Sequence, residues 1–119
     1  MRYLCLLYVA EDKLPQPGTA DFDEMVAGNI AANKAMAEAG VLVDSAPLHP
    51  VHSASTLRLR DGAALISDGP YAELHEQLGG YYLVDCADLD EALRWAKLIP
   101  AANYGTVEIR PVVDMGPHR

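Results

Sequence analysis

The residues best suited to chemistry lie in one short stretch, from Asp68 to Gln77. The stretch holds six side chains that form hydrogen bonds: Asp68, Tyr71, Glu73, His75, Glu76 and Gln77. A bare turn explains Asp68-Gly69-Pro70, because the aspartate accepts backbone hydrogen bonds and the proline fixes φ. Polar loops also tend to line clefts. The stretch therefore predicts either a simple turn or a small-molecule site, with Asp68 and His75 as candidate catalytic residues and Tyr71 and Glu73 as candidate ligand contacts.

The sequence around His75 allows two interpretations. It lies close in sequence to Glu73 and Glu76, whose negative charges favour the protonated imidazole. A protonated imidazole can act as a general acid or hold an anion. A solvated surface histidine explains the same sequence without any function, so both interpretations stay open.

A second pair of imidazoles, His49 and His52, is separated by Pro50-Val51. On a loop they could share a metal ion, with Asp44 or His75 as a third ligand. No Cys-rich or His-Glu-x-x-His pattern accompanies them. We therefore expect a solvated loop with no metal and no cofactor, and keep His49 and His52 as candidate ligand contacts only.

Composition limits the classes of partner. The chain has 119 residues, which is the size of a single domain spanning residues 1–119. Its 9 basic and 17 acidic residues give a net charge of -8, which repels phosphate backbones and anionic lipid. Direct binding to nucleic acid or membrane is therefore not expected. Two cysteines, Cys5 and Cys86, suggest buried hydrophobes in a cytoplasmic protein rather than a disulfide framework.

Alternation and turn residues predict the elements that position these groups. Asp61-Gly62 is a two-residue hairpin signal. Helices should begin at Asp21 and Asp88, each with a glutamate at its third position, and end near Gly40 and Pro100. Strands are expected over residues 2–10, 56–60, 63–67, 80–86 and 106–113. A further strand is expected to start at residues 41–43, before a loop at residues 47–52.

The two halves of the chain repeat one pattern: strand, an Asp-x-Asp-Glu helix start, helix, strand. A doubled β-α-β unit predicts an α+β, ferredoxin-like fold with an antiparallel sheet, here with an inserted hairpin. The first strand has apolar residues on both faces, and two helices can cover only one. We expect a homodimer to cover the other face of the sheet.

The run Asp68-Gly69-Pro70-Tyr71, followed by Ala72-Glu73 and Gly79-Gly80-Tyr81-Tyr82, resembles the DGPF signature of the YCII-related family. The resemblance extends from the first strand to about Val113. It implies a ferredoxin-like subunit that pairs into a dimeric α+β barrel. It also implies a link to regulation or a small-molecule response, since genes for DGPF-type proteins often lie beside those for extracytoplasmic-function sigma factors.

The sequence departs from the family pattern at several positions. The family usually has Phe where this chain has Tyr71, and commonly Thr-Lys where it has Leu74-His75, so a ligand matched to the lysine would bind differently. In shorter relatives a His and Asp pair on the first helix is the proposed catalytic dyad. Spacing places Asn29 and Glu38 there, and Asn29 cannot act as a base.

Two functions compete on these observations. The first is a small-molecule-binding protein or cofactor-free enzyme, with a pocket between sheet and helices lined by Asp68, Tyr71 and His75 and by His49 or His52. The second is an interaction module whose acidic surface contacts a basic partner such as a sigma factor. The polar cluster is denser than a turn requires, which favours the first.

Overall fold

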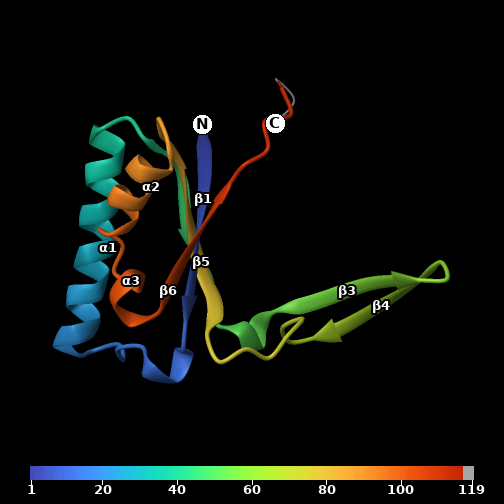
Figure 1. Ribbon diagram of the computed structural model, residues 1–119. Helices are drawn as coiled ribbons and strands as arrows, with labels where there is room; N and C mark the ends of the chain where they lie inside the picture. Colours follow the sequence, from blue (N-terminus) through green and yellow to red (C-terminus); the bar gives the residue numbers. More distant parts are fainter. Residues whose placement is uncertain (117–119) are drawn as a thin grey trace.

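The computed structural model describes residues 1–116 and is built around an antiparallel four-stranded sheet in the order β2-β5-β1-β6. Figure 1 shows this sheet between a layer of helices on one side and a projecting hairpin on the other. The mixed α+β class and the antiparallel sheet expected from the sequence are confirmed. The strands of the sheet are β1 (Arg2–Val9), β2 (Leu42–Pro47), β5 (Gln77–Asp85) and β6 (Thr106–Pro111).

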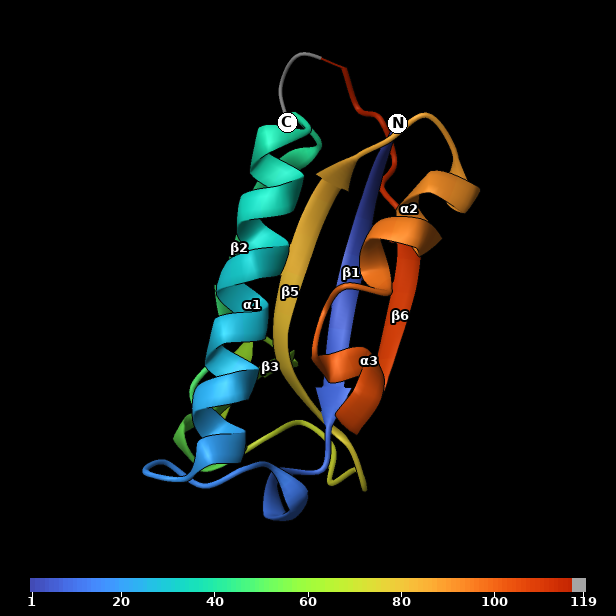
Figure 2. The ribbon, with the colours of Figure 1, turned by 90° about the vertical axis from the view of Figure 1, so that its left-hand side faces the viewer.

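The helices cover one face of the sheet, as Figure 2 shows from the helical side. They are α1 (Ala20–Glu38), α2 (Leu89–Ala96) and the single turn α3 (Ala101–Tyr104), which follows Pro100 and was not expected. Short 3-10 turns, η1 (Glu11–Lys13) and η2 (Val51–Ser53), lie in the connections. No helix within residues 1–116 is long and apolar enough to cross a membrane.

The two helix starts differ in how well the sequence located them. Asp88 caps α2 as expected, because its Oδ1 accepts a hydrogen bond of 2.9 Å from the Glu91 N–H. The prediction for α1 was wrong: Thr19 is the cap, and its Oγ1 accepts from the Phe22 N–H at 3.2 Å. Asp21 lies instead in the first helical turn, where its charge complements the helix dipole.

Strand β5 begins at Gln77, before the predicted start at residue 80, because Gln77 and Leu78 pair with β1. Strand β2 includes Pro47, where the sequence predicted a loop, because it pairs with β5. Pro47 lies opposite Gly80 and Ala46 opposite Tyr81, so backbone bonds continue through residues that usually interrupt a strand. Gly80 allows this approach because a Cβ there would lie 2.9 Å from the Ala46 carbonyl oxygen. Non-local pairing of this kind leaves no local sequence signal.

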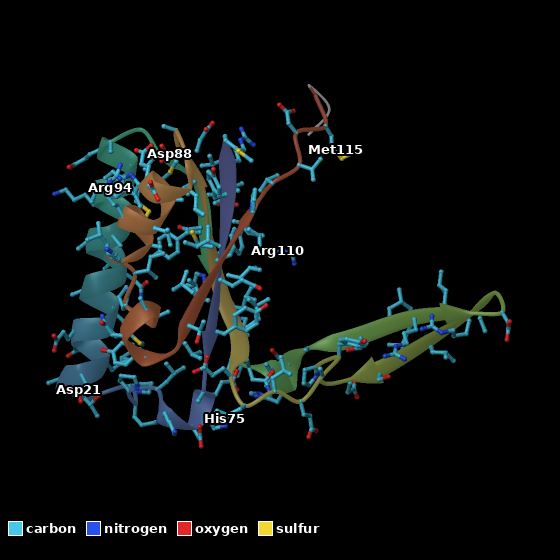
Figure 3. The ribbon with its side chains drawn as sticks, viewed as in Figure 1. Asp21, His75, Asp88, Arg94, Arg110 and Met115 are labelled. Carbon is cyan, nitrogen blue, oxygen red and sulfur yellow. The ribbon has the colours of Figure 1, made fainter. Side chains whose placement is uncertain are left out.

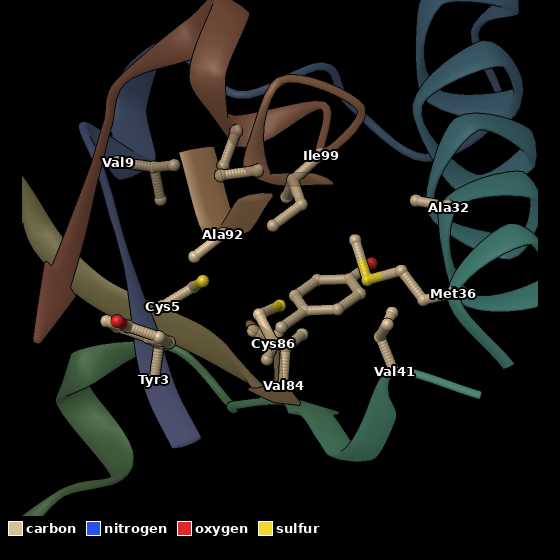
Figure 4. Packing of buried hydrophobic residues seen from close by; sticks show 13 residues of the cluster. Tyr3, Cys5, Val9, Ala32, Met36, Val41, Val84, Cys86, Ala92 and Ile99 are labelled. Atoms are coloured by element: carbon tan, nitrogen blue, oxygen red, sulfur yellow. The ribbon is translucent and has the colours of Figure 1, made fainter. Parts of the chain in front are cut away.

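The core lies between the sheet and the helices. Alternate residues of β1, Tyr3, Cys5 and Val9, point into it and are buried. Met36 of α1 and Ile99 before α3 are fully buried against them, as the close-up in Figure 4 shows. Both cysteines are buried and free, as predicted.

The other face of the sheet has no helix over it. We call it the open face: Leu4, Leu6 and Tyr8 of β1 alternate with the buried residues, and Leu83 and Tyr81 of β5 lie opposite Leu4 and Leu6. All five are only partly buried. Residues 1–116 therefore leave an apolar sheet face that no second layer of theirs covers.

The inserted hairpin forms as predicted, with β3 (Ser55–Arg60) and β4 (Ala63–Asp68) joined at Asp61-Gly62. Asp61 and Gly62 both have positive φ, 51° and 78°, which is the conformation of a tight type I′ turn. Every hairpin residue except Thr56 is exposed. The hairpin extends away from the sheet on the side opposite the helices (Figure 1).

Candidate functional site

A cavity of about 640 Å³ lies between the first half of α1 and the sheet. We call it the inner cavity. The described residues that line it include no Lys, Arg, His, Asp or Glu. Its wall is mostly apolar and is formed by Leu7, Val9, Leu14, Phe22, Met25, Val26, Ile30, Leu48 and Tyr104.

Four polar side chains in this wall form a connected cluster. Asn29 and Asn33 lie one turn apart on α1 and face Tyr82 of β5 and Ser45 of β2. The Tyr82 hydroxyl donates to Asn29 Oδ1 at 2.9 Å and accepts from Asn33 Nδ2 at 3.1 Å. Ser45 Oγ donates to Asn33 Oδ1 at 2.5 Å. We call these residues the polar quartet.

The quartet is not saturated by its own bonds. Asn33 uses both amide hydrogens, since Nδ2 also donates to the Asn29 carbonyl oxygen at 2.9 Å. Asn29 Nδ2 donates to the Met25 carbonyl oxygen at 3.2 Å, which leaves one amide hydrogen over. Ser45 Oγ keeps its lone pairs. The quartet can therefore offer a bound molecule one donor hydrogen, on Asn29 Nδ2, and the acceptor lone pairs of Ser45 Oγ.

The quartet is neutral around pH 7. Burial raises the pKa of the Tyr82 phenol above its ordinary value, although the hydrogen bond from Asn33 opposes this. Amides and a serine hydroxyl do not titrate in this range. The chemistry available within the quartet is therefore hydrogen bonding to a neutral group rather than proton transfer.

Two of the residues predicted from the sequence, His49 and Tyr71, line a second cavity of about 510 Å³ at the base of the hairpin. We call it the hairpin-base cavity. The Tyr71 ring is 75% exposed and lies 5.0 Å below the Arg58 guanidinium carbon, a cation–π contact. Leu48 lines both cavities, so they are neighbours.

Asp68, Glu73, His75 and His52 line neither cavity, and all four are exposed. The pocket expected between sheet and helices is present, but its walls come from other residues. The turn after β4 is held by the backbone of Gly69, whose N–H donates to Ala54 O at 2.7 Å and whose carbonyl accepts from Thr56 Oγ1 at 2.9 Å. His75 lies near the end of the sheet from which the hairpin departs (Figure 3).

His49, His52 and His75, the imidazoles within the described residues, do not assemble with other ligating groups. No group of three or more His, Cys, Asp or Glu side chains within residues 1–116 is arranged to hold a metal ion. His49 and His52 thus gain no third ligand from Asp44 or His75. The proposed roles of Asp68, Tyr71, Glu73, His75, His49 and His52 stay predictions.

Spacing along the sequence did not identify the polar quartet as a unit. Asn29 entered the predictions only as the residue at one position of the His and Asp dyad that is proposed for shorter relatives. A usable signal was present, because Asn29 and Asn33 are amides four residues apart on a helix otherwise rich in alanine. Tyr82 and Ser45 carried no such signal, since only the pairing of β2 with β5, in which Ser45 lies opposite Tyr82, brings them to the helix.

Comparison with known proteins agrees with the family resemblance. The YCII-related domain matches residues 1–116. An uncharacterised protein of Rhizobium meliloti (strain 1021) is 40% identical over 115 residues, covering 94% of this chain and 92% of the relative. Among solved structures, 5-chloro-2-hydroxyhydroquinone dehydrochlorinase from Burkholderia phenoliruptrix AC1100, in complex with 2,5-dihydroxybenzoquinone, aligns with a TM-score of 0.51 at 14% identity over 99% of this chain and 98% of its own. At that identity the likeness concerns the fold alone.

Proposed function

We propose, from the premise that this chain belongs to the YCII-related family, that it binds a small neutral molecule in the inner cavity. The observation that carries the proposal is the polar quartet, Asn29, Asn33, Ser45 and Tyr82, set in an otherwise apolar wall. Ligand sites are typically apolar clefts of about 300–1,000 Å³ with a few polar groups that orient the ligand. The inner cavity, at about 640 Å³, lies within that range.

The ligand class follows from the wall. The described lining has no cation to balance an anionic ligand, and the whole chain carries a net charge of -8. A neutral molecule avoids both the cost of burying an unpaired charge and the repulsion of an anion by the acidic chain. The one free amide hydrogen of Asn29 suits a carbonyl or hydroxyl oxygen, and Ser45 Oγ suits a hydroxyl hydrogen. A phenol or hydroquinone-like ring supplies both groups on an apolar body.

The structural neighbour supports this class without defining it. The dehydrochlorinase was solved with 2,5-dihydroxybenzoquinone, a six-membered ring that carries oxygen substituents. We extend to this chain only the general class of small oxygenated ring. Its own quartet favours the neutral members of that class over anionic ones.

A blocking substitution tests the proposal. Val26 lines the inner cavity and Val43 does not, yet each is 40% exposed. Val26→Trp should obstruct the cavity and weaken binding of the neutral fluorescent probe N-phenyl-1-naphthylamine by at least about 10-fold, the loss of roughly 1.4 kcal/mol. Val43→Trp, the matched control, should leave the affinity unchanged. Equal affinity for both variants would remove the inner cavity as the site.

A cofactor-free enzyme that uses His75 as acid or base, with Asp68 as a further candidate catalytic residue, is a second proposal. Its support is that Leu74, next to His75 in the sequence, lines the hairpin-base cavity together with His49 and Tyr71, although the side chains of His75 and Asp68 are exposed outside it. His75→Ala and Asp68→Asn should then reduce ligand binding or turnover. Unchanged behaviour of both variants would end this assignment.

The finer description of the assembly is also a proposal. The sheet order β2-β5-β1-β6 with helices on one face supports a ferredoxin-like subunit with an inserted hairpin. The partly buried apolar residues of the open face support a homodimer that stacks two sheets into a dimeric α+β barrel. The free, buried thiols of Cys5 and Cys86 support a cytoplasmic location.

A regulatory partner such as an extracytoplasmic-function sigma factor is the alternative to a small-molecule role. Its support is the net charge of -8, which would attract a basic protein surface. Such a complex should weaken steeply with added salt. No complex with a co-encoded sigma factor at low salt would count against it.

A further inference from the structure

The β3–β4 hairpin has one apolar face that nothing in the described chain buries. Leu57 pairs with Ile66 and Leu59 with Ala64, and residues directly opposite in a pair of strands point to the same side. Leu57 is 62% exposed, Leu59 65% and Ile66 72%. We call these four residues the apolar hairpin face.

The opposite side of the hairpin is different in character. It carries Arg58 and Arg60, with Leu65 opposite Arg58. Arg58 lies over the Tyr71 ring at 5.0 Å, so this side contacts the loop that follows β4. The apolar hairpin face points away from that contact and is the side left free.

A hairpin of this kind needs more than its own contacts. Two strands alone are marginally stable in water, and both of their outer edges are unpaired here because the hairpin forms its own sheet. Its exposed leucines and isoleucine would contribute to stability only if another surface covered them. The described part of the chain offers no such surface.

The direction of the hairpin identifies where that surface lies. The helices lie on one side of the sheet and the hairpin extends on the other (Figure 1), which is the side that the open face looks toward. The open face reaches the hairpin without a break: Tyr8, at its end, and Leu78, paired with Tyr8, line the hairpin-base cavity with Pro70. A molecule resting on the open face therefore lies beside the hairpin.

Charge is compatible with a second copy of this chain in that place. The hairpin contains Arg58, Arg60, Asp61 and Asp68 and is neutral, so the remainder of the chain carries the whole net charge of -8. A neutral, apolar arm can approach an acidic copy without like-charge repulsion. Arginine is also a residue that protein interfaces favour.

We infer that the β3–β4 hairpin is a clamp, whose apolar face of Leu57, Leu59, Ala64 and Ile66 packs on a second copy of this chain seated on the open face. The inference rests on the homodimer proposed above and adds to it the element that holds the partner. In a two-fold dimer each copy clamps the other, so every hairpin contact occurs twice.

A charge placed on the apolar hairpin face tests the inference. Leu59→Glu changes an exposed residue, so the folded chain should tolerate it, and circular dichroism verifies this. The dimer contains two equivalent hairpin contacts. If the substitution weakens each contact by about 10-fold, the dimer dissociation constant measured by analytical ultracentrifugation rises about 100-fold. Leu65→Glu is the control, because Leu65 lies on the opposite side of the hairpin and is 50% exposed. It should change the dimer dissociation constant by less than about 3-fold.

The outcomes separate the clamp from the dimer itself. A wild-type chain that stays monomeric at micromolar concentration overturns both. If the wild type is a dimer that Leu6→Glu weakens and Leu59→Glu does not, the clamp is overturned and the dimer of stacked sheets is kept. Hydrogen exchange gives a second test: residues 55–68 should be protected in the dimer, and fast exchange there at concentrations where the dimer forms would overturn the clamp.

Discussion

Removing the hydroxyl of Tyr82 tests the polar quartet as a structural unit. The Tyr82→Phe variant keeps the ring, which is 3% exposed, and loses only the atom that joins α1 to β5. That oxygen donates to Asn29 Oδ1 at 2.9 Å and accepts from Asn33 Nδ2 at 3.1 Å. Each of these partners would lose one bond in a partly buried position.

The magnitude follows from counting these bonds. A typical internal hydrogen bond contributes roughly 0.5–1.5 kcal/mol net, so two give a loss of about 1–3 kcal/mol in the free energy of unfolding. For a domain of this length each kcal/mol corresponds to roughly 4 °C in Tm. We expect Tyr82→Phe to melt about 4–12 °C below the wild type. It should also weaken binding of a neutral phenol, because the orientation of Asn29 is no longer fixed.

Tyr81→Phe is the matched control on the same strand. The Tyr81 hydroxyl donates to Asp44 Oδ2 at 2.8 Å, a bond that is exposed in the single chain, where water can replace it. Both variants are therefore compared with the wild type at a concentration at which the chain is monomeric. Thermal and urea denaturation at pH 7, followed by circular dichroism, should show a clearly smaller change for Tyr81→Phe than for Tyr82→Phe. Equal changes for the two variants would refute the assignment of a structural role to the quartet.

Three further predictions concern the scaffold. Burial, with a smaller effect of Cys86, raises the pKa of Cys5 from 9.0 to about 11. The native state therefore keeps a proton that the unfolded chain releases, so the free energy of unfolding should fall by about 2 kcal/mol as pH rises from 9 to 11. Cys5→Ala should flatten that fall in urea titrations, and parallel wild-type and variant curves would contradict the argument. Gly105→Ala should cost more than about 3 kcal/mol, because the new Cβ would collide with the Tyr8 carbonyl oxygen. Gly79→Ala should be clearly milder in the same melts, because its Cβ would lie 3.2 Å from a Val9 methyl and 3.9 Å from the Leu7 carbonyl oxygen. Asp88→Ala should cost about 1 kcal/mol by removing the cap of α2, and a variant as stable as wild type would show that the cap contributes nothing.

The sequence was informative where local chemistry decides structure. Asp61-Gly62 specified the hairpin turn, Asp88 the start of α2, and the alternation in β1 the buried Tyr3 and Cys5. It failed where distant segments decide: β5 begins early because Leu78 pairs with Tyr8 of β1, and β2 reaches Pro47 because Gly80 permits the close approach of the two strands.

The candidate site shows the same limit. Polar residues close together in the sequence were the candidates, but they lie exposed: Asp68 at the end of β4, and Glu73 and His75 on the loop that follows it. The quartet joins residues from α1, β2 and β5, of which Tyr82 stands 49 positions from Asn33 and 53 from Asn29. Only the folded sheet brings them together, so spacing along the chain could not identify them.

Methyl resonances of methionine give the most direct test of the inner cavity. The chain has four methionines: Met25 lines the inner cavity, Met36 is fully buried in the core, and Met1 and Met115 are 62% and 74% exposed. In protein labelled with 13C at these methyls, titration with a neutral phenol should shift the Met25 signal saturably and leave those of Met1 and Met115 in place. A Met25 signal that does not move, or one that moves together with Met1 and Met115, would contradict ligand binding in the inner cavity.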